Sequence, residues 1–248
     1  MTPDTIDAAL PKHLDEMRSI VKWVISFAFV ASILVIQGRA EMEALGVELS
    51  RNEAFFIIAV IYIALCVAVA GHAQQIATLL RGVPVERLSA STERLASHEW
   101  LFNPYAFYWN GGEYFRPGYW GFVALIATFW LCMACLYALV PGFLDTLVFE
   151  PRTDSFFDTM TWSEAVKGVG YAVPVGAFAA IGDLAMKRII GTYKACAARC
   201  VPAEPLLAAR FEKVQADLTA ASHTGIATGG VVFIAVLALA YALPRYVL

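Results

Sequence analysis

Five long apolar runs constrain the fold of this chain more than any other feature. They cover residues 20–38, 54–71, 118–142, 168–191 and 225–244. A helix needs about 20 mostly apolar residues to cross a bilayer. The fourth run is the weakest, because it carries Asp183, Lys187 and Arg188 toward one end. The sequence therefore predicts an all-α fold, a polytopic membrane helix bundle with about five transmembrane helices. Four spans, with the fourth or fifth segment re-entrant, are the main alternative.

The composition agrees with a membrane protein. Charged residues make up 16% of the chain, against roughly a quarter in an average soluble domain, and the mean hydropathy is +0.63. The N-terminal segment, residues 1–19, is polar and precedes a run without a small-residue cleavage site, so we do not expect a signal peptide. We expect this segment to stay in the cytoplasm.

The positions of Lys and Arg predict an orientation, since these residues accumulate on the cytoplasmic side of a membrane. With five spans and the N-terminus inside, thirteen of the 18 basic residues fall inside and five fall outside. The sequence therefore predicts a multi-pass protein of a bacterial inner membrane, with a cytoplasmic N-terminus and the C-terminus outside.

Two segments between the spans have the periodicity of amphipathic helices. Residues 85–100 place apolar side chains on one helical face, and residues 204–222 do the same. We expect both helices on the cytoplasmic side, on the inner leaflet or on each other, and we expect the second to continue into the fifth span. The predicted organisation is a cytoplasmic segment (1–19), a transmembrane hairpin (20–71), an amphipathic helix with an aromatic elbow (72–117), a second hairpin with an acidic outer loop (118–191), an amphipathic helix (192–224), and the fifth span with a short outer tail (225–248).

An aromatic stretch lies immediately before the third span. Residues 100–122 hold eleven aromatic side chains in 23 positions, and Asn103-Pro104, Gly111-Gly112 and Pro117-Gly118 interrupt them. Trp and Tyr gather where a membrane meets water, and the three breaks exclude one continuous helix. We predict an interfacial elbow that needs no ligand; a lipid, quinone or partner groove is the alternative. The predicted lipid or partner surface comprises Trp100, Tyr105, Tyr108, Trp109, Tyr114, Tyr119 and Trp120.

The fourth and fifth spans carry signals for close helix packing. Pro174 removes a hydrogen bond to the carbonyl of Gly170 and predicts a kink. Small residues at both spans predict close helix contacts, within the chain or between copies. These small residues are Ala172, Gly176 and Ala180 in the fourth span, and Gly225 and Gly229 in the fifth.

Asp183 is the candidate for a mechanistic role, because an acidic residue within a span is a functional hypothesis by default. Lys187 lies four residues later, which is the spacing of an ion pair on one helix face. We favour a structural ion pair. An ion or proton pathway is the alternative.

The sequence holds no motif for zinc, phosphate or dinucleotide binding and none for a nucleophile elbow. The pairs Cys132/Cys135 and Cys196/Cys200 are interpreted as packing residues. We therefore predict no catalytic residue, no metal and no cofactor.

Three classes of function fit these features, and no family resemblance selects among them. The leading hypothesis is a non-catalytic membrane subunit that anchors or organises a complex at the inner face of the membrane. A small oligomeric channel or permeabilising effector is the first alternative, and an intramembrane redox or lipid-modifying enzyme is the second. Expected partners are membrane lipids and either further copies of the chain or a membrane or cytoplasmic protein, with no direct role for nucleic acid.

Overall fold

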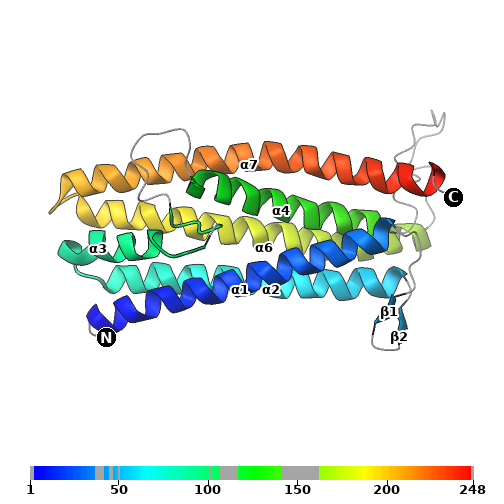
Figure 1. Cartoon of the computed structure of the whole chain (residues 1–248), viewed down its shortest axis with the longest axis horizontal. Coiled ribbons are helices and arrows are strands. Elements are labelled where there is room, and N and C mark those ends of the chain that lie inside the picture. The colour runs from blue at the N-terminus through cyan, green and yellow to red at the C-terminus, as the bar shows by residue number, and fades with distance from the viewer. Residues whose placement is uncertain are drawn as a thin grey trace.

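The computed structural model describes residues 3–36, 42–44, 47–49, 51–100, 102–106, 117–140 and 162–246. They form an elongated bundle of helices that lie roughly along one axis (Figure 1). The helices are α1 (Pro3–Ile36), α2 (Arg51–Gly82), α3 (Val85–Ala96), α4 (Pro117–Leu139), α6 (Trp162–Cys200) and α7 (Pro205–Tyr246). The prediction of a helical membrane bundle is confirmed at this level.

Four helices within the described ranges are long and apolar enough to cross a membrane. They are Glu53–Gly82, Gly118–Leu139, Val169–Cys200 and Pro205–Leu239. Each overlaps most of one of the runs expected to span. The first predicted span, residues 20–38, falls in the C-terminal part of α1 and on residues beyond the helix, and lies partly outside the described residues.

Neighbouring helices run in a consistent set of directions. Tyr62 on α2 stacks on Phe178 on α6, and Phe55 on α2 contacts Tyr171 on α6. The two pairs have the same separation in sequence, so α2 and α6 run parallel. α4 and α7 also lie side by side. The N-terminus lies at one end of the bundle, and the C-terminus lies at the other (Figure 1).

The two longest helices exceed the thickness of a bilayer. α6 has 39 residues and α7 has 42, which correspond to about 58 Å and about 63 Å at 1.5 Å per residue. The hydrocarbon core of a bilayer is about 30 Å thick. About half of each helix therefore extends beyond it. The prediction that the second amphipathic segment continues into the fifth span is confirmed by α7.

Two separate hydrophobic cores divide the bundle along its length. The first, which we call the polar core because charged side chains surround it, includes Leu10, Leu14, Leu80, Tyr193 and Phe211. It joins the N-terminal parts of α1 and α7 to α3 and to the C-terminal parts of α2 and α6. We call this region, with the turn after α3, the polar half. The apolar core lies in the other half of the bundle, the apolar half, and includes Phe55, Tyr62, Cys132, Leu136 and Phe178.

The polar half has the surface of a water-soluble bundle. Charged side chains occupy many of its exposed positions: Lys12, Asp15, Glu16, Arg81, Glu86, Arg87, Arg94, Lys194, Glu204, Arg210, Glu212 and Lys213. The exposed side chains of the apolar half include Phe56, Val60, Val173, Val231 and Ile234. Exposed apolar side chains suit a lipid environment and exposed charged side chains suit water, so this contrast divides the bundle into two halves of different surface chemistry.

Amphipathic periodicity explains the helices of the polar half. In α1 the buried side chains follow each other at three- and four-residue spacing, as a helix with one apolar face requires. They are Ile6, Leu10, Leu14, Met17 and Val21, each at most 4% exposed. In α3 the face around Leu88, Thr92 and Leu95 is buried as the sequence predicted. That face packs on other helices of the bundle.

A short β-hairpin is the part of the fold that the sequence did not predict. β1 (Met42–Ala44) pairs antiparallel with β2 (Val47–Leu49), with Met42 opposite Leu49. It lies at the end of the bundle opposite the N-terminus (Figure 1). This position is the one expected for the first outer loop.

Candidate functional site: the polar half of the bundle

The N-terminal turns of α1 are tied to α3 by an acidic side chain. Ser91 Oγ donates to Asp7 Oδ1 over 2.6 Å, and Arg94 forms an ion pair with Asp7 at 3.2 Å. A hollow of about 410 Å³ opens beside this contact, lined by Asp7, Ala8, Arg87, Ala90 and Arg94. Because Asp7 is mostly buried and Arg94 mostly exposed, the pair fixes the position of α1 and leaves the arginine face in water.

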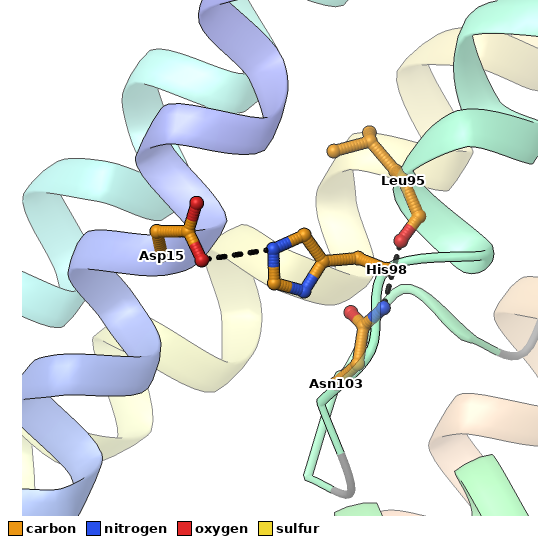
Figure 2. A network of polar contacts seen from close by, with 4 residues as sticks. All are labelled: Asp15, Leu95, His98 and Asn103. Atoms are coloured by element: carbon orange, nitrogen blue, oxygen red, sulfur yellow. Dashed lines mark hydrogen bonds and ion pairs between the residues drawn. The ribbon is translucent and has the colours of Figure 1, made fainter.

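A second contact joins α1 to the turn that follows α3. Figure 2 shows the imidazole of His98 facing Asp15 on α1, with Nε2 and Oδ1 3.1 Å apart. In the same turn, Asn103 Nδ2 donates to the carbonyl of Leu95 over 2.7 Å, and its Oδ1 accepts from the backbone N–H of Tyr105. Asn103 is fully buried. It therefore closes α3 and reverses the chain, as Asn side chains commonly do in turns.

The turn is anchored in the polar core by Tyr105. Its ring is fully buried beside Tyr193, whose hydroxyl donates to the carbonyl of Tyr105 over 3.0 Å. Burial raises the pKa of the Tyr105 hydroxyl, which keeps it neutral. The sequence placed Tyr105 on a lipid or partner surface, and this was wrong, because Asn103 turns the chain inward at this point.

The end of α2 is capped by a side chain from α6. Arg199 donates to the carbonyls of Leu80 and Val83 over 2.7 and 2.6 Å. The last carbonyls of a helix have no partner within the helix and carry partial negative charge. The half-buried guanidinium satisfies the carbonyl of Leu80 in the last turn of α2 and that of Val83 just beyond the helix. Arg188 makes a similar link one level closer to the apolar half, donating to Gln74 over 2.6 Å.

Two histidines face each other between α1 and α2. His13 Nδ1 and His72 Nδ1 are 3.0 Å apart, so the N–H of one ring donates a hydrogen bond to the unprotonated nitrogen of the other. Burial, followed by the charges of His72 and Lys12, lowers the pKa of His13, and only Glu16 opposes them. The contact therefore requires at least one neutral ring.

The other members of the predicted aromatic surface have different positions. Trp100 is half-buried against the polar core. Tyr119 is within hydrogen-bond distance of Thr224 on α7, at 2.8 Å, and Trp120 is 53% exposed. Tyr108, Trp109 and Tyr114 lie outside the described residues.

The glycine pair of the fifth span makes a contact within the chain. A Cβ at Gly225 would lie 2.8 Å from Ile126, and one at Gly229 would lie 2.1 Å from Trp130, both on α4. Only glycine allows α7 this close to α4. Gly182 on α6 does the same for the ring of Phe129.

The small residues of the fourth span are not used in this way. Ala172, Gly176 and Ala180 are exposed, and a Cβ at Gly176 or Gly170 would meet nothing within 4 Å. The contact predicted along this stripe is therefore absent from the described chain, because the face of α6 that carries Phe178 and Gly182 is turned inward instead. α6 continues as one helix through Pro174.

Asp183 and Lys187 form the ion pair that their spacing predicted. Their side chains are 59% and 71% exposed, so the pair lies on the outer surface of the bundle.

Of the cysteines, Cys132, Cys135, Cys196 and Cys200 are buried as free thiols. Among the described residues, no three His, Cys, Asp or Glu side chains gather as metal ligands would.

The sequence did not identify the residues that join the helices of the polar half. Asp7, His13, Asp15 and Arg199 looked like ordinary polar residues, because a periodic pattern shows which face is buried but not which distant side chain it meets. Asn103 gave the only signal, as part of an Asn-Pro turn.

No protein-family model, no curated protein and no solved structure matches this chain.

Proposed function

We propose that the chain is a non-catalytic integral membrane subunit whose polar half projects into the cytoplasm and docks a protein partner. In this proposal α1 crosses the bilayer as a fifth span beside the four other membrane helices. The opposite positions of the two chain termini support an odd number of crossings. The bias of Lys and Arg supports the cytoplasmic location of the polar half.

The observation that carries the proposal is the apolar tip of the polar half. The turn between α6 and α7 exposes Val201 at 57%, and the first turn of α7 exposes Leu206 at 88%. Lipid covers exposed apolar side chains in the apolar half but does not reach this end. Asp183 lies near the end of the fourth apolar run, and α6 extends about 25 Å further from Asp183 to Cys200. This length carries the tip away from the lipid in the proposed arrangement. Exposed apolar side chains beyond the reach of lipid indicate a protein contact.

Affinity purification in mild detergent tests this proposal. The double variant Val201→Glu with Leu206→Glu should recover at least tenfold less of a stoichiometric partner than the unchanged chain, because two charges would enter an apolar contact. The matched control is Thr219→Glu, an exposed position on α7 about 20 Å from Leu206. It should recover the partner normally.

Two outcomes contradict the proposal. The first is recovery of the partner in full by the tip variant. The second is labelling, from outside intact cells, of a single cysteine introduced by Ala203→Cys into a cysteine-free chain. The channel alternative gains no support from Asp183, whose exposed side chain does not line a path through the described bundle.

A further inference from the structure

One basic side chain of α1 lies where the polar half meets the apolar half. His13 contacts His72 on α2 in the polar half, and the carbonyl of Ala28 contacts Cys135 on α4 in the apolar half. Lys22 lies between these two levels, about 13 Å along the helix from His13.

Lys22 faces away from the bundle. The buried side chains of α1 around it, Met17, Val21 and Ala28, lie on the opposite face. Together with Ser19, Trp23 and Ser26, Lys22 lines a hollow of about 290 Å³ on the outer surface. The Trp23 ring is 58% exposed there. Within the part of the chain that the structure describes, no carboxylate pairs with Lys22.

An unpaired ammonium at this depth needs a counter-charge, because a charged side chain is costly in hydrocarbon. Side chains on a helix point toward its N-terminus, so Lys22 is directed over Ser19 and toward the polar half. Lipid phosphates lie at that edge of the membrane. The Trp23 ring offers an apolar face to an acyl chain and an N–H to the headgroup region.

We propose that Lys22, Ser19 and Trp23 form a binding site for the phosphate of an anionic phospholipid in the cytoplasmic leaflet. This inference rests on the proposed function for the placement of α1 as a membrane span. Lys22 supplies the charge, the Ser19 hydroxyl donates a hydrogen bond, and Trp23 contacts the first part of an acyl chain. The Ser26 hydroxyl donates to the Lys22 carbonyl and holds the backbone of the site.

The test is binding of dioleoyl phosphatidylglycerol to the purified full chain in detergent, measured by native mass spectrometry. Lys22→Gln should bind this lipid about fivefold more weakly, which is the contribution of one Lys near an anionic membrane, about 1 kcal/mol. Lys12→Gln removes an exposed charge of α1 outside the hollow and should change nothing. Lys22→Arg should retain most of the affinity.

Three results overturn the site: equal affinity in the unchanged chain and Lys22→Gln, an equal loss in Lys12→Gln, or displacement of the lipid by inorganic phosphate alone. The last would indicate a free anion as the natural ligand. No partner is present in this measurement, so its result is independent of docking at the tip.

The depth of α1 has its own control. A cysteine introduced by Ser26→Cys into a cysteine-free chain should resist a water-soluble thiol reagent in intact membranes. A freely reactive cysteine there contradicts the five-span placement in the proposed function. A protected cysteine combined with unchanged lipid binding in Lys22→Gln contradicts only the lipid site.

Discussion

Phe211 and Phe178 are both fully buried, one in the polar core and the other in the apolar core. In the proposed function their burial has a different meaning, because water surrounds the polar half and lipid tails surround the apolar half. Removing a ring from water stabilises the folded chain directly. Removing it from lipid gains only better packing, since lipid tails are as apolar as the protein interior.

The contacts between helices follow the same division. In the apolar half, α6 approaches α4 through glycine, as at Gly182 against Phe129. In the polar half, helices are joined by polar side chains from other elements, such as Asp7 and Arg199. Shape therefore determines which helices pair in lipid, whereas in water apolar burial provides stability and polar bonds fix the positions of the helices.

The largest expected effect compares the two phenylalanines directly. Phe211→Ala should lower the free energy of unfolding by about 4 kcal/mol, because it loses both the transfer from water and the packing of the ring. Phe178→Ala should cost about 2 kcal/mol, because only the packing contribution remains in lipid. Reversible unfolding in mixed micelles measures both. Equal losses would contradict the proposed difference between the halves.

A glycine substitution tests the importance of shape where α7 meets α4. Gly229→Leu should destabilise the chain by about 3 kcal/mol, since its Cβ would lie 2.1 Å from Trp130 Cδ1 and 2.8 Å from Trp130 Cβ, close to the α4 backbone. Gly230→Leu is the matched control, because nothing lies within 4 Å of its Cβ position. The measurement is the thermal midpoint of both variants in the same detergent. A similar midpoint for both would show that α7 can move away from α4 at no cost.

The smallest effect concerns pH in the polar half. The pKa of His13 is lowered in the folded chain from 6.5, so the unfolded chain binds more protons just below that pH. The stabilising contribution of the neutral ring is complete above pH 6.5 and is lost as the pH falls through the lowered pKa. The free energy of unfolding should therefore be lower at pH 5 than at pH 7.5, and this group contributes to the difference.

His13→Gln should remove this part of the pH dependence, and His223→Gln, at an exposed position, should leave it. An unchanged pH dependence in His13→Gln would show that the facing histidines do not contribute to it.

The sequence predicted best those features that depend only on residues close together in one helix. The buried face of α3, the continuity of α7 and the pairing of Asp183 with Lys187 each depend on residues within a few turns of one helix. The small-residue stripe around Gly176 makes no close contact within the described chain, because small residues permit contact without selecting which face is used, and a contact between copies stays a prediction. α6 instead packs with Gly182 against the ring of Phe129 on α4, and no local sequence pattern predicts this contact.

Contacts between distant segments could not be predicted from one sequence. His13 and His72 are 59 residues apart, and each alone looks like a polar residue near a helix end. Tyr105 belongs to a stretch whose composition is typical of a membrane interface, yet the turn made by Asn103 buries it. The backbone partners of Asn103, rather than its neighbours in sequence, determine this outcome.

The cap that Arg199 gives to α2 has a consequence for the order of synthesis. Arg199 follows Val83 by 116 residues, so the ribosome makes the end of α2 long before its cap. At 5–20 residues per second this delay is on the order of 10 s. During that interval the newly made N-terminal hairpin carries carbonyls that only water or a chaperone can satisfy. The turn between α2 and α3 is therefore completed late in biogenesis, when α6 has been translated and inserted beside α2.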